Sequence, residues 1–427
     1  MSPRPSDELS DRLTRVADQR LADADRELAD RFPGDAGGRQ PVHTVYVPAD
    51  RCGPDVVPRW GSAARRHLDE HRGLLADLVG KEADELLPLV ADKLAREPVE
   101  DLRIDLEDGY GHRPDEDGDA VAAARALAAA QADGISAPFH GIRVKSLEVP
   151  TRARGIRSLV HFLAALLEAG GSPESLVTTL PKVTSVDQVR VLVDLLHELE
   201  EEWGLPRRTL RFEIQVETTQ AVLGPDGTAL VARMIHASGG RCTGLHYGTY
   251  DYSAACGIAA AYQSMEHPVA EHARLVMQAA AAGTGVRLSD GSTNVLPVGD
   301  DDQVRYGWRT QLRLVRRSLE RGFYQGWDLH PAQLPSRYAA TFGFYRDGLS
   351  AATARLERYL HGGGRAIVDE PATARALADF VVRGMEAGAA RKDEVTTATR
   401  TSAEELVRLA RPRRTGPRDL DAPEARH

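Results

Sequence analysis

The sequence predicts an α/β protein built as a (β/α)8 TIM barrel, with a helical extension at its N-terminus and a helical segment at its C-terminus. Eight β-type runs alternate with helical segments between residues 42 and 329, and such alternation implies parallel strands joined by right-handed crossovers. Eight such units over roughly 290 residues fit a closed barrel better than an open doubly wound sheet. No glycine-rich dinucleotide motif follows the first run, which also disfavours the open sheet.

Each expected strand is short and is bounded by loop residues or by a helical segment. In chain order the strands are Val42–Pro48, Leu102–Leu106, Gly141–Lys145, Val177–Lys182, Leu210–Val216, Cys242–Tyr247, Val286–Val298 and Tyr324–Leu329. Gly291 and Ser292 weaken the seventh run, because glycine has a low β-propensity.

The segments between these runs carry apolar residues at helical spacing. They are Ser62–Leu78, Glu82–Arg96, Asp119–Ala132, Ile156–Ala169, Val186–Leu199, Val269–Ala282 and Gln303–Arg321, with one further helix between the fifth and sixth strands. Ser185 is suited to cap the helix that follows the fourth strand.

Both ends of the chain are expected to be helical. Asp7–Phe32 is amphipathic and stops at Pro33-Gly34, and it is suited either to docking on the barrel or a second subunit or to forming a loose arm. After Pro335 the chain is helical, with a break at Gly362–Gly364. The expected parts are an N-terminal extension (1–40), the catalytic barrel (41–335), a lid or oligomerisation segment (336–390), and a helix with a disordered tail (391–427).

Composition excludes several classes of protein. The chain has 54 Lys and Arg against 63 Asp and Glu, a net charge of −9, which argues against a nucleic-acid partner. Its three cysteines, Cys52, Cys242 and Cys256, show neither disulfide nor zinc spacing. Because no signal peptide or membrane-length apolar run is found, we expect a cytoplasmic protein without a membrane partner.

Two carboxylates stand at the ends of neighbouring predicted strands. Glu217 follows the fifth strand and Asp251 follows the sixth. Residues at the C-terminal ends of barrel strands are the ones that usually carry chemistry, and two carboxylates with waters are a common way to hold Mg²⁺. The sequence therefore predicts a Mg²⁺ site at this point, with Mn²⁺ as an alternative ion.

Polar residues also follow most of the other strands. They are Asp105, Glu107 and Asp108, then Arg143 and Lys145, then Lys182, and finally Asp328 with His330 and Pro331. Taken alone, Asp105 or Asp328 is better explained as the N-cap of a following helix. The convergence of the whole set on one end of a barrel favours an active site.

Six of these segments together resemble one known superfamily. They are Asp105–Asp108, Ile142–Val144, Leu180–Val183, Val216–Thr218, Gly248–Tyr252 and Gly326–Pro331. In this order they are similar to the HpcH/HpaI aldolase and citrate lyase β-subunit superfamily, which also includes malyl-CoA lyase and malate synthase. The first strand, Val45-Tyr46-Val47-Pro48, resembles that of the citrate lyase branch.

The resemblance implies roles for individual residues. Glu217 and Asp251 become the direct Mg²⁺ ligands, while Glu107 and Asp108 bind metal waters and orient Arg143. Arg143 then stabilises the oxygen of an enolate or a developing alkoxide.

The same resemblance implies a substrate site. Backbone N–H groups after Gly248, at Thr249, Tyr250 and Asp251, would hold the carboxylate of a 2-oxo acid, and His330 and Pro331 join this substrate-binding set. Asp369 lies in Gly364–Pro371, which resembles a lyase segment whose Asp is an acid/base, commonly in a neighbouring subunit's site; a homo-oligomer is therefore implied. Capping of the helix at Pro371 is an alternative role for Asp369 and compatible with the first.

The expected activity is a Mg²⁺-dependent carbon–carbon lyase or synthase, of aldol or Claisen type, acting on a 2-oxo acid or its adduct. The use of a CoA thioester is open, because no CoA-binding surface is identifiable and Arg39–His43 departs from the basic stretch that usually precedes the first strand. Two alternatives stay open: a CoA-independent pyruvate-type class II aldolase, and a non-catalytic metabolite-binding barrel subunit.

Overall fold

The centre of the molecule is a closed barrel of parallel strands. The computed structural model describes residues 4–35, 37–362 and 370–412, and its eight-stranded sheet has the order β7-β6-β5-β4-β3-β2-β1-β8. Neighbouring strands pair in parallel. A parallel bridge joins Ser289 to Gln325, and the N–H of Asp290 donates to the Gln325 carbonyl at 2.8 Å. This contact closes β7 onto β8, so the predicted (β/α)8 barrel is confirmed.

All eight predicted strands are present. Their bounds are β1 His43–Pro48, β2 Asp101–Asp105, β3 Phe139–Arg143, β4 Leu176–Leu180, β5 Arg211–Val216, β6 Cys242–Tyr247, β7 Arg287–Ser289 and β8 Gly326–Asp328. The predicted length of the seventh strand was wrong, because β7 ends where Asp290 turns to bind Arg274 (Oδ2 to Nη1 2.7 Å). The third strand also ends earlier than predicted, so that Lys145 lies in the loop after it.

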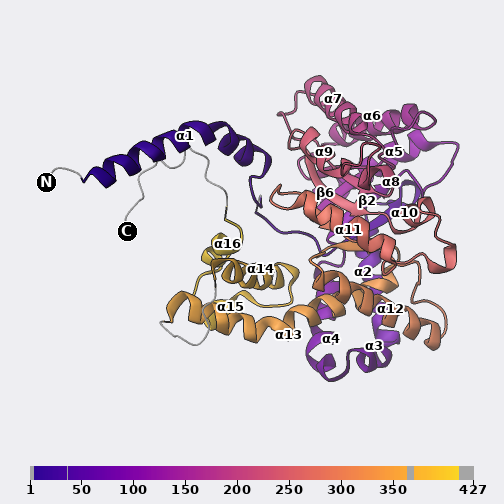
Figure 1. The fold of residues 1–427 in the computed structure, drawn as a ribbon. Coiled ribbons are helices and arrows are strands. Elements are labelled where there is room, and N and C mark those ends of the chain that lie inside the picture. Colours follow the sequence, from indigo (N-terminus) through magenta and orange to yellow (C-terminus); the bar gives the residue numbers. More distant parts are fainter. Residues whose placement is uncertain (1–3, 36, 363–369, 413–427) are drawn as a thin grey trace.

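The helices between the strands surround the sheet, while the first helix and the C-terminal helices lie to one side of the barrel (Figure 1). Their bounds are α1 Pro5–Arg31, α2 Val56–Glu70, α3 Arg72–Val79, α4 Ala83–Arg96, α5 Glu116–Ala132, α6 Arg152–Glu168, α7 Val186–Glu202, α8 Thr219–Val222, α9 Leu230–Ala237, α10 Thr249–Ala255, α11 Pro268–Ala281, α12 Asp301–Glu320, α13 Leu334–His361, α14 Pro371–Ala387, α15 Lys392–Thr399 and α16 Ala403–Ala410. The segment predicted as one helix over Ser62–Leu78 is two, interrupted at His71. The single helix expected between the fifth and sixth strands is also two, α8 and α9.

The barrel interior holds a buried polar network. Arg103 of β2 donates two hydrogen bonds to Glu213 of β5, at 2.9 and 2.8 Å. Nε2 of His246 lies 2.8 Å from the same carboxylate, and the Trp327 indole N–H donates to Nδ1 of His246 at 3.0 Å. These contacts join β2, β5, β6 and β8 across the barrel. Because removing one member of such a pair leaves a buried charge uncompensated, the network ties the strands into one arrangement.

The C-terminal helices form a second layer beside the barrel. The first half of α13 packs on α4 and α12, and its second half packs with α14 and α15 around a separate apolar cluster that includes Leu356, Val381, Val395 and Leu406. Arg383 of α14 donates to the side chain of Gln40 at 2.9 Å. This contact fixes α14 next to the linker that enters β1, on the side of the barrel opposite the carboxyl ends of the strands.

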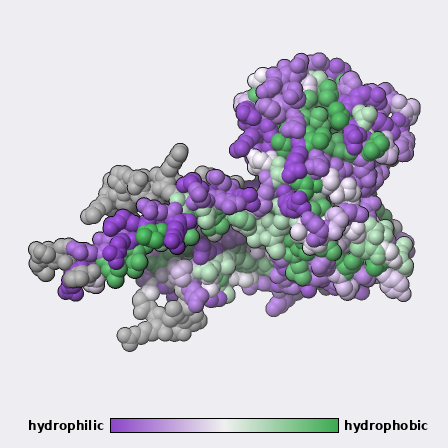
Figure 2. All heavy atoms as spheres, turned by 45° about the horizontal axis from the view of Figure 1, so that its top comes forward, coloured by the Kyte–Doolittle hydropathy of each residue, from purple (hydrophilic) through white to green (hydrophobic). Residues whose placement is uncertain are grey.

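Helix α1 projects from the barrel (Figure 1), and Phe32, directly after its last residue, packs edge-on against His236. Leu13 and Leu21 are 58% and 53% exposed. In the space-filling view, apolar surface interrupts the hydrophilic surface along the projecting part of the molecule (Figure 2). Among the helices of the described ranges, none has the length and apolar composition needed to cross a lipid bilayer.

Candidate active site at the carboxyl ends of the strands

Four carboxylates converge on one cation at the carboxyl ends of the strands. The ammonium of Lys182 donates to Asp108 Oδ2 and Asp251 Oδ2, both at 2.9 Å. The same nitrogen lies 3.5 Å from Glu107 Oε1 and 3.5 Å from Glu217 Oε2. The structure thus brings together the four acidic residues that the sequence analysis selected from the ends of three different strands.

The local backbone explains why these side chains meet. Glu217 directly follows β5, and Asp251 lies in the first turn of α10 after β6. Gly248 donates its N–H to the Val216 carbonyl at 3.0 Å, and a Cβ at Gly248 would lie only 2.5 Å from the Cβ of Glu217. A glycine is therefore required for the ends of β5 and β6 to approach so closely.

Lys182 adopts a left-handed backbone conformation, with a φ of +53°. A non-glycine residue in this region costs roughly 1–3 kcal/mol, and such strain concentrates at functional sites. This conformation lets Lys182 contact Glu217 twice. Its backbone N–H donates to Glu217 Oε1 at 2.7 Å, and its ammonium faces Oε2. The turn after β4 is thereby locked onto the end of β5.

Burial and the concentration of negative charge shift the pKa values of these acids. Burial, together with the charges of Asp251 and Glu107, raises the pKa of Glu217 to about 8, against the opposing effect of Lys182. Burial also raises the pKa of Glu107. The pKa of Asp108 is lowered although burial opposes this, because the Lys182 ammonium binds it. A cation placed among these oxygens would relieve the charge that raises the pKa of Glu217.

Arg143, at the end of β3, lies beside this cluster. Its Nε and Nη2 donate to the two oxygens of Asp105, each at 2.7 Å, and its Nη1 lies 3.5 Å from Glu107 Oε2. The guanidinium also stacks over Tyr46, with Cζ 4.6 Å from the ring centre. Because it is buried and held by a bidentate pair, Arg143 presents a fixed positive charge.

The remaining predicted substrate residues divide between two places. Gly248 and Thr249 begin α10 next to Glu217, and the hydroxyl of Tyr250 accepts the N–H of Asn294 at 2.7 Å. His330 and Pro331 instead line a hollow of about 490 Å³ that they share with Tyr46, Pro48, Arg51, Arg59, Trp60 and Leu329. Tyr46 connects the two places, since it lines the hollow and underlies Arg143.

Two strand-end residues, Asp105 and Asp328, have structural partners that the sequence analysis did not predict. Asp105 is not the cap of a helix: besides holding Arg143, it accepts the N–H groups of Glu107 at 3.0 Å and Gly109 at 2.9 Å. Asp328 is not a cap either, since it is buried and paired with Arg337 and with His43 Nδ1 at 2.8 Å. These contacts place Asp328 in the packing between β8, β1 and α13.

Lys145 is one of the polar residues that the sequence analysis selected after the third strand. Its ammonium donates to the Leu106 carbonyl at 2.6 Å and lies 3.0 Å from Glu116 Oε2. It pins the loop after β2 to the start of α5. Asp369, the proposed acid/base, lies outside the described residues.

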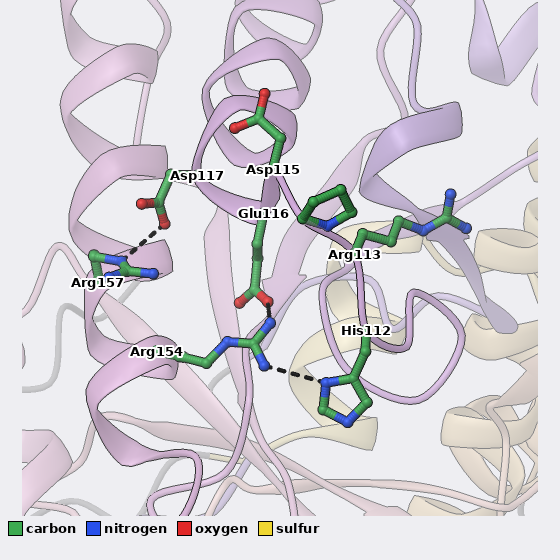
Figure 3. Close-up of a pocket in the computed structure, with 8 residues that line it drawn as sticks. His112, Arg113, Asp115, Glu116, Asp117, Arg154 and Arg157 are labelled. Atoms are coloured by element: carbon green, nitrogen blue, oxygen red, sulfur yellow. Dashed lines mark hydrogen bonds and ion pairs between the residues drawn. The ribbon is translucent and has the colours of Figure 1, made fainter.

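A neighbouring pocket of about 380 Å³ opens between α5 and α6 (Figure 3). Arg154 pairs with Glu116 there, and Arg157 Nε donates to Asp117 Oδ1 at 3.0 Å. Since both guanidinium groups face carboxylates of α5, we assign this pocket no anion-binding role.

Three further residues of the site received no role from the sequence. The sequence analysis names Lys182 only as a polar residue that follows its strand. Its charge at that position indicates a possible partner for the carboxylates after the other strands. Gln215 bridges the site, because its amide N–H donates to Glu217 and its oxygen accepts Nη1 of Arg143 at 3.3 Å. Gln215 and Tyr46 lie within their strands. A search for polar residues that follow the strands therefore does not select them.

Comparisons with known proteins place the chain as follows. No curated protein sequence matches it. Among solved structures it is similar to a citrate lyase β-subunit of Mycobacterium tuberculosis in complex with oxaloacetate and magnesium, with 19% identity, coverage of 70% of this chain and 96% of that chain, and a TM-score of 0.42. A Haloferax volcanii malate synthase is similar at 15% identity, with 85% and 89% coverage and a TM-score of 0.49.

A HpcH/HpaI aldolase/citrate lyase family protein of Burkholderia cenocepacia is similar at 17% identity, covering 76% of this chain and 98% of that chain with a TM-score of 0.39. All three belong to the superfamily that the sequence motifs resemble. A family model described as a domain of unknown function, DUF6986, matches residues 21–414. This match spans most of the chain, and the protein belongs to the DUF6986 family.

Proposed function

We propose that this protein is a Mg²⁺-dependent enzyme that makes or breaks a carbon–carbon bond next to the carbonyl of a 2-oxo acid. The observation that carries the proposal is the convergence of Glu107, Asp108, Glu217 and Asp251 on one cation position, here taken by the Lys182 ammonium. Arg143 lies directly beside that position.

The donor set fits the metal. Mg²⁺ is a hard cation that takes oxygen ligands and is commonly bound through one or two carboxylates with several waters retained. Glu217 and Asp251 would hold it, and Glu107 and Asp108 would accept hydrogen bonds from its waters. When bound, Mg²⁺ supplies a Lewis acid that polarises the carbonyl of a chelating oxo acid.

The chain's own residues would provide the rest of the catalysis. Arg143 is held in place by Asp105 and donates toward an oxygen that gains negative charge when the carbon–carbon bond changes. The N–H groups of Thr249 and Tyr250, in the first turn of α10, have no acceptor within their own helix and can bind the substrate carboxylate. Lys182, whose ammonium lies among these carboxylates, would be close enough to neutralise a second acidic group of the substrate.

Asp369 is proposed as the group that moves the proton at the reacting carbon, by resemblance to the lyase branch. The position of the helix that follows it, α14, supports action on a second subunit, and therefore a homo-oligomer. Arg383 anchors the later part of α14 at Gln40, so Pro371 lies at the opposite end of a helix about 25 Å long.

Thermal unfolding tests the metal site. A ligand that binds only the folded state raises Tm by mass action, so Mg²⁺ is expected to raise the Tm of the full chain. Glu217→Gln and Asp251→Asn should remove this increase, while Glu198→Gln, an exposed change on α7, should keep it. An increase that survives in both site variants would contradict the proposed ligands.

The substrate class is tested separately. Pyruvate, oxaloacetate and glyoxylate, each with and without acetyl-CoA, are to be compared in Mg²⁺-dependent turnover and in stabilisation of the Mg²⁺-loaded protein. We expect a 2-oxo acid to stabilise the wild type and not the Asp251→Asn variant. Turnover that requires acetyl-CoA would assign a synthase, and cleavage without it an aldolase.

A further inference from the structure

A second cluster of metal-binding side chains lies at the junction of α2 and α3. His67, Glu70 and His71 follow one another at positions i, i+3 and i+4, which places them on one face of a helical turn. Their ligand atoms all lie within 4.8 Å of one another. Two imidazoles four residues apart on a helix are a recurrent way of binding one metal ion.

The surroundings of this cluster hold the two rings in place. Trp308 of α12 is fully buried and donates its indole N–H to the Ala332 carbonyl at 2.8 Å. Its ring packs edge-on against His67 and His71, with ring centres 5.2 and 6.2 Å away. A rigid indole behind both imidazoles restricts their rotamers, which lowers the entropy lost when an ion is bound.

Two further observations support a metal site at this cluster. Nε2 of His67 is buried and has no hydrogen-bond partner among the residues that the structure describes. A buried nitrogen of this kind costs free energy unless a ligand satisfies it. In addition, Asp301 of α12 brings a second carboxylate to the cluster, with its Oδ1 3.2 Å from Nδ1 of His71.

We propose that His67, Glu70 and His71 bind one divalent transition-metal ion of the Zn²⁺ type, with Asp301 as the carboxylate that positions His71. Imidazole and carboxylate ligands select Zn²⁺, Ni²⁺ or Cu²⁺ over Mg²⁺, which prefers oxygen ligands alone. The site is half-open, since Glu70 is exposed and both histidines are partly buried, so solvent completes the coordination.

The ion would have a structural consequence. It would join the α2–α3 junction to the first turn of α12, two segments far apart in the sequence that already meet through Trp308 and the His71–Asp301 contact. Helix α2 also packs against the short helical turn Pro331–Gln333 after β8. A clamp at this place would therefore stiffen the wall of the barrel mouth next to His330.

The test is a Zn²⁺ titration of the chelator-stripped full chain by calorimetry, in excess Mg²⁺ and also in the Glu217→Gln background. Both conditions separate this site from the carboxylate cluster, so its failure and that of the proposed function are distinguishable. We expect one bound Zn²⁺ per chain in each. Co²⁺, as a spectroscopic probe, should give visible absorption bands that added Zn²⁺ removes.

Three variants identify the ligands. His71→Asn and Glu70→Gln should each weaken Zn²⁺ binding by about tenfold or more; Glu70 is exposed, so its variant is expected to fold normally. His197→Asn is the matched control, because His197 also pairs with a Glu on a helix, at 3.1 Å from Glu201, outside the cluster. The proposal is overturned if the wild type binds no stoichiometric Zn²⁺, or if binding is undiminished in both ligand variants.

Discussion

At the scale of single residues, the site is governed by one excess of negative charge. Four carboxylates share a single ammonium, and burial, with a further contribution from the charges of Asp251 and Glu107, raises the pKa of Glu217 to about 8. A carboxyl group that keeps its proton near neutral pH is a marker of a functional site, although buried ion-pair networks shift pKa values as well. Proton and metal ion compete for the same oxygens, which makes the pH dependence of the site informative.

The first prediction concerns that competition. Because the folded pKa of Glu217 is raised, the folded state binds a proton that the unfolded chain releases, and stability without a metal falls as the pH rises from about 4.3 toward about 8. Mg²⁺ binds the ionised form, so the Mg²⁺-induced increase in Tm should grow between about pH 6 and pH 9. In Glu217→Gln, both the stability without metal and the Mg²⁺-induced increase in Tm should lose this pH dependence. In Glu198→Gln, both should keep it. A wild-type increase that is the same across this range would refute the competition.

The second prediction concerns Arg143. Arg143→Lys keeps one positive charge but loses the two parallel hydrogen bonds to Asp105 and the stacking on Tyr46. Turnover should fall about 10²–10³-fold, as when one electrostatic donor is removed, while the Mg²⁺-induced increase in Tm is retained. Arg157→Lys, on the exposed face of α6, is the control and should keep its activity. Wild-type turnover in Arg143→Lys would exclude the proposed role.

At the scale of elements, the site depends on how closely β5 and β6 approach at their carboxyl ends. Val216 and Tyr247 are paired in the sheet register, and the chain then leaves each strand through Glu217 and Gly248. The absence of a side chain at Gly248 leaves room for that of Glu217. The geometry of the carboxylate cluster is thus a property of two adjoining strand ends rather than of either alone.

The third prediction tests this approach. In Gly248→Ala the new methyl group would lie 2.5 Å from the Cβ of Glu217, so the strand ends must separate, at a cost of about 1–3 kcal/mol. Urea unfolding should report that loss, and the Mg²⁺-induced increase in Tm should shrink. The control is Gly73→Ala in α3, where an added Cβ meets no atom within 4 Å; it should be neutral or slightly stabilising. Equal stability of the two variants would contradict the packing argument.

At the scale of the whole molecule, α14 and the second half of α13 lie away from the barrel mouth. Helices α13 and α14 pack side by side, and Gly362 and Glu370 stand at the end of this pair that is remote from the Gln40 anchor. The chain between them carries Asp369. We propose that this end of the helix pair reaches the barrel mouth of a second copy of the molecule, where Asp369 would act across subunits.

The fourth prediction follows from that arrangement. Asp369→Ala and Glu217→Gln are each expected to be inactive, and mixed oligomers should recover about a quarter of the wild-type activity, since random pairing joins one intact metal site to one intact Asp369. Subunit exchange is verified with two affinity tags. No recovery despite exchange would favour action of Asp369 on its own barrel, and full activity of Asp369→Ala alone would exclude a catalytic role for this residue.

The sequence by itself determined the strands and the acids at their ends. The sixth strand has the bounds that were predicted, and Glu217 and Asp251 follow their strands as expected. Strand position is a local property, because alternating apolar residues and loop residues are visible in a short window. Parallel strands then place their carboxyl ends together in any closed barrel, whichever neighbours each side chain finds.

Only the tertiary structure decided which partner each buried polar side chain has. Arg103 and Glu213 meet inside the barrel, Asp328 binds Arg337 of α13, and Lys182 reaches into the four carboxylates. Arg103 and Glu213 are separated by 110 residues in the sequence, so no local pattern relates them. A buried charge takes the opposite charge that barrel closure brings within reach, and that choice is made by the assembled strands rather than by any one segment.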